Sequence, residues 1–199
     1  MQQKNIQMGK KLKNKPLVSI ICICYNHKRF VEEHIKMARP GVVRGGRRVN
    51  LSARVSEKII KGRVSQPYFG NRIMLDLVLD SIRKKARDVE QGIYIKNHWF
   101  SSMLNDKDRS IKGCNFSMLK QDLLAVNGYD ERFDQPAYGE DTDLEARLRR
   151  NGVMFLGIRN RAIQYHLYHR QLSRDINNKD IYDDNNAKEI TYTPFGINQ

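Results

Sequence analysis

The chain has little cysteine, a single tryptophan and no long apolar run. Cys22 and Cys24 lie too close together on one extended segment to bridge each other, which would leave Cys114 unpaired. We therefore expect reduced, buried thiols instead of a disulfide framework. The longest apolar run, Leu17 to Tyr25, is much shorter than the roughly 20 residues that cross a bilayer, and no small-residue cleavage site follows it. These absences exclude a transmembrane helix and a signal peptide from our expectations, and we predict a cytoplasmic protein.

Acidic residues are also scarce, since 22 Asp and Glu stand against 36 Lys and Arg, for a formal net charge of +14. The positive charge is concentrated in residues 10–15, 39–63 and 83–87. Such clusters favour polyanionic partners, namely nucleotide phosphates, anionic lipid headgroups or nucleic acid. Solvated surfaces without a partner are the alternative, and charge alone does not choose between them.

The first part of the chain has the pattern of an α/β unit. A basic polar arm, residues 1–15, ends at Pro16 and is followed by "LVSIICIC", a β-branched run typical of a central parallel strand. Asn26 can then cap a helix whose face carries Phe30, Val31, His34 and Ile35. We expect residues 16–36 to form strand, tight turn and helix.

The connection that follows, residues 37–110, is basic and less regular. "ARPGVVRGGRRVN", with its glycines and proline, predicts a loop or an irregular connection. Two helices are expected after it. The first spans Ser52 to Lys61 and ends at Gly62, and the second spans Asn71 to Asp88. In the second we expect a packed apolar stripe made of Met74, Leu75, Val78, Leu79 and Ile82, and "GIYI" at 92–95 predicts a short strand.

The last part, residues 111–175, predicts a strand and two helices before a polar tail, residues 176–199. "IKGCNFSML" predicts a strand that leads into the helix "KQDLLAVNG", which ends at Asn127-Gly128. The second helix is expected to end at Asn151-Gly152. The whole of residues 16–175 is expected to form a single domain.

The segment "YGEDTDLEAR", residues 138–147, concentrates four carboxylates in this basic chain. Thr142 and Glu145 match the capping-box pattern at the start of the second helix. Asp143 can pair with Arg147, and Glu145 with Arg149, one turn later. Glu140 and Asp141 would then lie just ahead of the cap with no helical task, either as exposed loop acids or as groups for chemistry.

The order of these segments resembles that of inverting family 2 glycosyltransferases. "GCNFSMLKQDLLAVNGYDERFDQPAYGEDTDLEARLRRNG" and "AIQYHLYH" are similar to the C-terminal half of that family, and also to the galactosyltransferase C-terminal domain. "PLVSIICICYNHKRF" resembles the first strand and turn of the same family. The resemblance covers roughly residues 16–35 and 111–170 and implies a GT-A fold, an α/β sandwich that binds nucleotide-diphospho-sugars.

The resemblance also implies roles at the acceptor side. Asp141 matches the general base that accepts a proton from the attacking hydroxyl, and Glu140 would orient the acceptor. Gly139, Tyr138 and Asn115 match acceptor-binding positions.

At the donor side, Cys24, Tyr25 and Asn26 match the family's nucleotide-binding turn. His166, with His169 as second choice, matches a ligand of the divalent metal, Mn²⁺ or Mg²⁺, which neutralises the departing diphosphate. The alternative for the two histidines is packing or simple exposure. The implied partners are a UDP-sugar donor, a glycan or lipid-linked acceptor, and the anionic inner leaflet of a membrane.

One part of the family's pattern is missing. "DKD" at 106–108 lacks the buried strand that precedes the family's D-x-D motif, and "DTD" at 141–143 belongs to a helix start. The GT-A sandwich is therefore expected to be incomplete, without the D-x-D-containing segment. An active transferase and a chain made inactive by this loss both remain open.

Two alternative functions belong to protein classes other than the glycosyltransferases. Residues 36–65 hold nine Lys and Arg against one Glu, which suits a nucleic-acid or polyanion-binding module. However, no aromatic residue interleaves those charges before Tyr68, and no zinc-finger or glycine-loop RNA motif is present, so no specific nucleic acid is expected. The other rival is a structural interaction domain.

Overall fold

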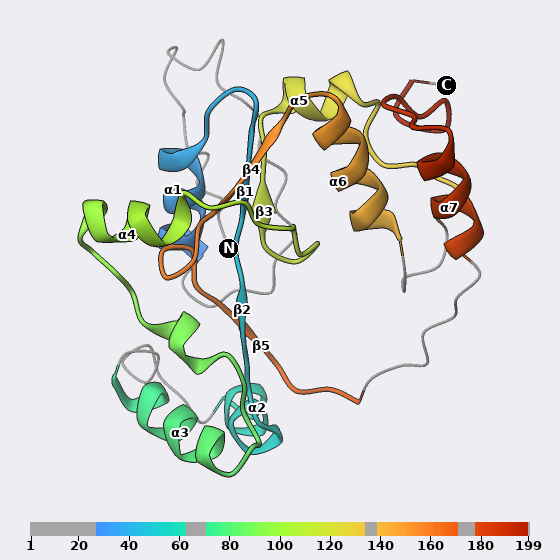
Figure 1. Cartoon of the computed structure of the whole chain (residues 1–199). Helices are drawn as coiled ribbons and strands as arrows, with labels where there is room; N and C mark the ends of the chain where they lie inside the picture. The colour runs from blue at the N-terminus through green and yellow to red at the C-terminus, as the bar shows by residue number, and fades with distance from the viewer. Residues whose placement is uncertain (1–26, 63–70, 134–138, 171–177, 199) are drawn as a thin grey trace, which may run out of the picture.

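The computed structural model describes residues 27–62, 71–133, 139–170 and 178–198. The predicted first strand and the nucleotide-binding turn, residues 17–26, lie outside these ranges. Within them the chain is a mixed α/β structure of short strands and helices (Figure 1). The elements are α1 (His27–Met37), β1 (Val42–Gly45), β2 (Arg48–Asn50), α2 (Ala53–Ile60), α3 (Asn71–Ile82), α4 (His98–Asn105), β3 (Phe116–Ser117), α5 (Lys120–Ala125), α6 (Glu140–Arg150), β4 (Met154–Gly157), β5 (Gln164–His166) and α7 (Lys179–Ala187).

A three-stranded sheet, ordered β3-β1-β4, forms the centre of the upper half in Figure 1. β1 pairs in parallel with β4, from Val42 with Met154 to Gly45 with Gly157, and antiparallel with β3. Residues of α6 and of the segment after α5 pack on this sheet in one apolar cluster, and α1 and α4 lie on its other side. The sheet is therefore covered by helices on both faces.

A second, two-stranded sheet continues the same two chain segments. β2 pairs in parallel with β5, and their side chains join those of α2 and α3 in a separate apolar cluster. In Figure 1 this smaller unit lies below the three-stranded sheet. Residues 42–50 and 154–166 thus run side by side through both clusters.

The prediction of a loop at residues 38–50 is wrong, because β1 and β2 occupy most of it. Val42, Val43 and Val49 are fully buried, so apolar burial decides the structure. One of the glycines serves close packing: a Cβ on Gly46 would overlap the side chain of Asn115. Glycine in this segment indicates a near approach of another chain segment, and not a break in the strand.

The predicted helix at 52–61 is confirmed as α2, with the Ser52 hydroxyl accepting from the Val55 amide at 3.2 Å, and the helix after residue 119 is confirmed as α5. The helix predicted at 71–88 ends early, at Ile82. Of its predicted stripe, Met74 packs against the core, but Leu75, Val78, Leu79 and Ile82 face outward. Ile73 and Leu77 are buried instead. Because α3 is apolar on adjoining faces, its periodicity could not decide which face packs.

Other differences concern residues 92–95 and two helices. The strand expected at 92–95 does not form, since the Asn160 side-chain amide donates to the carbonyls of Glu90 and Ile93 at 2.7 and 2.8 Å. The sequence predicted neither α4 nor α7, which lies in the polar tail. None of the helices in the described ranges combines the length and the apolar character that crossing a membrane requires.

Candidate functional site

The acidic segment 138–147 opens α6, but at a different residue from the one predicted. Gly139, with φ 108°, is the N-cap, and its carbonyl accepts from the Asp143 amide at 2.7 Å. Thr142 therefore lies inside the helix, and the capping-box prediction is wrong. Glu140 and Asp141 are the first two residues of α6, where the unpaired helix amides favour negative charge.

The carboxylate of Asp141 is held from two sides. One oxygen, Oδ2, accepts a hydrogen bond from the Gly113 amide at 2.7 Å, and the other, Oδ1, accepts from the Tyr129 hydroxyl at 3.3 Å. A side chain at residue 113 would overlap the carboxylate, so glycine permits this approach. Burial and the charges of Asp141 and Glu140 raise the pKa of Tyr129, which keeps its hydroxyl protonated as a donor. Asp141 is therefore an oriented carboxylate.

A buried arginine supports the turn that presents Tyr129. Asn127 and Gly128 have positive φ angles, 61° and 75°, and end the α5 segment as the sequence predicted. Arg147 of α6 donates to the carbonyls of Val126 and Gly128 at 2.7 and 2.8 Å. The position of Tyr129 is thereby tied to the helix that carries Asp141.

The neighbours of Asp141 in the sequence contribute differently. Glu140 is half-buried and makes no side-chain hydrogen bond with another residue of the described ranges. Gly139 packs against Phe133, whose ring a Cβ would overlap. Tyr138 lies outside the described residues.

Asn115, predicted to bind the acceptor, is fully buried. Its amide donates to the carbonyls of Arg47 and Ala162 at 2.8 and 3.2 Å, and its Oδ1 is 3.1 Å from His34 Nε2. Its backbone carbonyl accepts from the Gly46 amide at 2.7 Å, and its backbone amide donates to the Lys112 carbonyl at 2.8 Å. In this arrangement Asn115 holds the Gly113-Cys114 turn in place and has no free amide group for a sugar.

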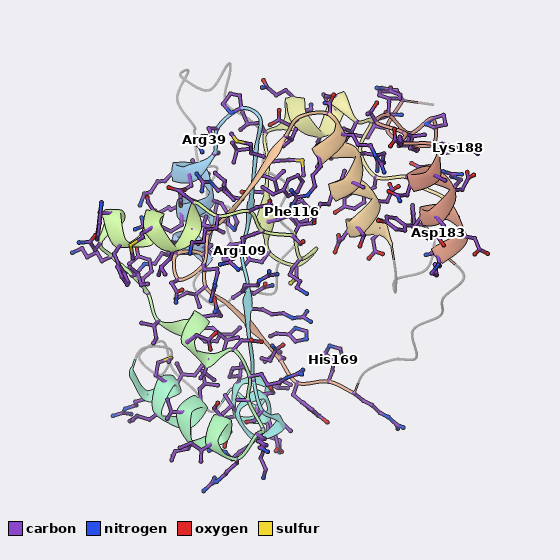
Figure 2. The ribbon with its side chains drawn as sticks, in the orientation of Figure 1. Arg39, Arg109, Phe116, His169, Asp183 and Lys188 are labelled. Atoms are coloured by element: carbon purple, nitrogen blue, oxygen red, sulfur yellow. The ribbon has the colours of Figure 1, made fainter. Side chains whose placement is uncertain are left out.

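A cationic side chain, Arg48, contacts the same turn. Arg48 Nη1 is 3.9 Å from Cys114 Sγ. His166 and His169 stack edge to face with ring centroids 5.0 Å apart, and Figure 2 shows His169 on the segment that follows β5. Burial, Arg48 and His169 lower the pKa of His166, in that order, which favours the neutral imidazole.

Neutral imidazoles can bind a metal, but these two histidines do not make a complete site for Mn²⁺ or Mg²⁺. Within the described ranges no three His, Cys, Asp or Glu side chains come together in a way that could hold an ion. Mg²⁺ in particular prefers oxygen ligands, which this pair lacks. The role of His166 and His169 as metal ligands stays a prediction, and no step below depends on it.

The acids of the "DKD" triplet have other partners. Asp106 Oδ1 lies 3.6 Å from Arg44, and Asp108 Oδ1 lies 2.9 Å from Arg149 of α6. The two carboxylates thus tie the segment after α4 to β1 and α6.

The structure adds Gly113, Tyr129 and Arg48 to the candidates from the sequence. Gly113 and Tyr129 lie inside the motifs "GCNFS" and "NGYDE", which carry the family resemblance, but the sequence assigned no function to these two residues. Arg48 lay in the segment that was predicted as a loop. Cys24, Tyr25 and Asn26 lie outside the described residues.

A comparison with known protein families gives a match over part of the chain. A family model described as the N-terminal domain of galactosyltransferase matches residues 101–170, whereas the motifs had suggested the C-terminal domain. The matched range contains Gly113, Tyr129, Asp141 and His166. No curated protein and no solved structure matches the chain. Residues 101–170 therefore form a glycosyltransferase-like region within an α/β structure.

Proposed function

We propose that this chain is a glycosyltransferase of the family 2, GT-A type. It would transfer a sugar from a nucleotide-sugar donor, a UDP-sugar, to a hydroxyl of a glycan or lipid-linked acceptor, with inversion. The observation that carries the proposal is the oriented carboxylate of Asp141, held by Gly113 and Tyr129 inside the galactosyltransferase-like region.

The chemistry needs one base at this position. Asp141 accepts the proton of the acceptor hydroxyl while the acceptor oxygen bonds to the anomeric carbon of the donor. The bond from that carbon to the diphosphate breaks on the opposite face, and the nucleoside diphosphate leaves with its electron pair. A carboxylate offers about four lone-pair positions, and Gly113 and Tyr129 use two of them, so others remain for the hydroxyl.

Orientation is the second contribution of the site. Two donors fix the plane of the Asp141 carboxylate, which reduces the freedom lost when the acceptor binds. Glu140, beside it at the start of α6, would accept hydrogen bonds from other hydroxyls of the acceptor. Gly139 and Tyr138 would also contact the acceptor.

The donor would lie at the cationic side. Arg48 and the imidazoles of His166 and His169 suit an anionic diphosphate, and Cys24, Tyr25 and Asn26 would contact the nucleotide. A bound Mn²⁺ or Mg²⁺ would neutralise charge on the leaving group.

Transfer assays with a panel of UDP-sugars and glycan or lipid-linked acceptors test the proposal. We expect Asp141→Asn to lower transfer by at least about 100-fold, because a general base contributes about that much or more. Asp183→Asn on α7 is the control, since it removes an exposed carboxylate that pairs with Lys179 and makes no contact with Asp141, and it should retain activity. Full transfer by folded Asp141→Asn would overturn the proposed base, and no binding of any nucleotide would overturn the proposed function.

The polyanion-binding alternative finds less support. Several cations of the basic stretch are already paired: Arg54 and Lys58 bind Asp76 at 2.9 and 3.0 Å, and Lys61 binds Glu57. Arg44 is buried and donates to the carbonyl of Gly157 at 3.3 Å. The stretch therefore does not present nine free charges to a nucleic acid.

A further inference from the structure

Helix α3 has an apolar outer face that the site does not use. Leu75, Val78, Leu79 and Ile82 are 68, 47, 51 and 75% exposed. Their spacing of three and four residues places them along one side of the helix over two turns. They form a continuous stripe, which we call the α3 stripe, whereas Ile73 and Leu77 fill the core on the other side.

Basic residues border both ends of the α3 stripe. Arg72 precedes it by one turn, and Arg83, Lys84, Lys85 and Arg87 follow it directly; all five side chains are exposed. An apolar stripe with cations at its ends has the composition of a helix that lies in the surface of an anionic bilayer.

The acids of α3 point away from the stripe. Asp76 binds Arg54 and Lys58 of α2 at 2.9 and 3.0 Å. Asp80 is buried and accepts from the Ser52 hydroxyl at 2.5 Å and from Arg54 at 3.1 Å. These contacts fix the rotation of α3 and neutralise its negative charge on the protein side. Asp88 and Glu90, farther along, are the exposed acids nearest in sequence.

We propose that α3 binds an anionic lipid bilayer, with the α3 stripe entering the headgroup boundary and the bordering cations contacting lipid phosphates. A second copy of the chain is the obvious competing occupant. Two-fold pairing through this stripe would bring the same five cations of each copy together, and each chain already carries a net charge of +14. The charges therefore favour a lipid surface over self-association.

This inference does not depend on the proposed transferase function. It rests on exposure and charge around α3, which lies at the opposite end of the molecule from α7 and away from α6 (Figure 1). If both hold, α3 would keep the chain at a surface where a lipid-linked acceptor is found.

The test is flotation of the full chain with vesicles of phosphatidylcholine alone or with about 30% phosphatidylglycerol, at low and at about 0.5 M salt. We expect binding to the anionic vesicles only. The double variant Leu75→Ser/Leu79→Ser should lower the apparent affinity by about tenfold or more, because it removes two of the four inserted apolar side chains. Lys84→Gln/Lys85→Gln should weaken binding and reduce its dependence on salt.

Matched controls separate this site from the general positive charge of the chain. Trp99→Ser/Met103→Ser removes exposed apolar side chains from α4, and Lys179→Gln/Lys188→Gln removes two exposed charges from α7. Both controls should bind like the wild type. Equal losses in controls and α3 variants would overturn the proposal, as would wild-type binding by the Leu75/Leu79 variant. The lipid proposal would also be overturned if the wild type bound no vesicles but formed a dimer that the Leu75/Leu79 variant dissociates. That result would favour self-association.

Discussion

Asp143 and Arg147 form a buried ion pair one turn apart on α6, with Arg147 Nε 2.7 Å from Asp143 Oδ2 and side chains only 2 and 0% exposed. Asp143 Oδ1 also accepts from Asn185 of α7 at 2.8 Å, and Arg147 reaches the carbonyls of the Asn127-Gly128 turn. The pair therefore joins α6, α7 and the turn that presents Tyr129.

Arg147→Met should lower the free energy of unfolding by about 3 to 5 kcal/mol, because it leaves the Asp143 carboxylate buried without its partner. Urea denaturation followed by circular dichroism measures the loss. Lys179→Met is the control, since the Lys179–Asp183 pair has the same spacing but lies exposed on α7. It should change stability by less than about 1 kcal/mol. Equal effects of the two variants would contradict a special role for the buried pair.

Gly113→Ala should disable the candidate site while leaving the fold intact. The new methyl group would overlap both oxygens of the Asp141 carboxylate and push it from its position. If transfer activity is established, we expect a loss of about 100-fold, the order of effect of a misplacement of about 1 Å. Gly45→Ala is the control, because its Cβ would meet its nearest neighbour, the Ser110 carbonyl oxygen, at an ordinary 3.5 Å. Unchanged transfer by Gly113→Ala would show that the contact does not matter.

His34 should make the protein sensitive to mild acid. Its ring is buried between Ser117 Oγ, at 2.7 Å, and Asn115, and burial lowers its pKa from 6.5 to about 4. Between pH 6.5 and 4 the unfolded state binds a proton that the folded state does not. Stability therefore falls as the pH drops through this window, by up to about 3 kcal/mol. Urea titrations at several pH values measure the slope, and His34→Gln should reduce it. The same slope in both proteins would contradict this source of acid sensitivity.

Thr193→Val should destabilise the packing of the C-terminal segment. Burial raises the pKa of Asp130, but hydrogen bonds from Arg132, Thr193 and Asn185 outweigh it and hold the pKa at about 2. The ionised carboxylate thus stabilises the fold at neutral pH, and this contribution is lost as the pH falls below 3.8 through 2.

Removing the Thr193 hydroxyl, which donates to Asp130 at 2.8 Å, should cost about 1.5 to 3 kcal/mol at pH 7. The difference between variant and wild type should shrink near pH 2, where the carboxylate becomes protonated. Chemical denaturation at both pH values tests this. A loss that does not change with pH would indicate a packing defect instead.

Local sequence patterns predicted the helices that have clear ends. Helix α2 begins after Ser52 and ends before Gly62, the α5 segment ends at Asn127-Gly128, and α6 ends at Asn151-Gly152. These ends follow from cap and turn chemistry, which needs no distant contact. The pairs Asp143–Arg147 and Glu145–Arg149 also followed from spacing alone and are confirmed. Spacing did not predict the first residue of α6, because both Gly139 and Thr142 could cap the helix. In the structure Gly139 is the N-cap.

The strands β1 and β2 could not be predicted because their partners are distant in the sequence: β4 and β5 lie more than a hundred residues away, and Ser117 of β3 lies 73 residues from Arg44. Gly45 and Gly46 suggest a loop until Asn115 and β4 are placed beside them. In the same way, Gly113 and Tyr129 gain a role only when α6 brings Asp141 between them. The outer face of α3 was wrongly predicted to be the packed face, because α3 carries apolar residues on two adjoining faces and only one of them is buried.

The pairing of the strands has a consequence for the galactosyltransferase-like region itself. Each strand within residues 101–170 finds its described partner outside that range: β3 and β4 pair with β1, and β5 pairs with β2. A fragment limited to residues 101–170 would therefore have no sheet to close and should not fold as an autonomous unit. During synthesis, β1 must wait for β4 before it can pair in parallel, so the sheet forms late and slowly. The smallest unit that can carry Asp141 in its present geometry must include residues 42–50.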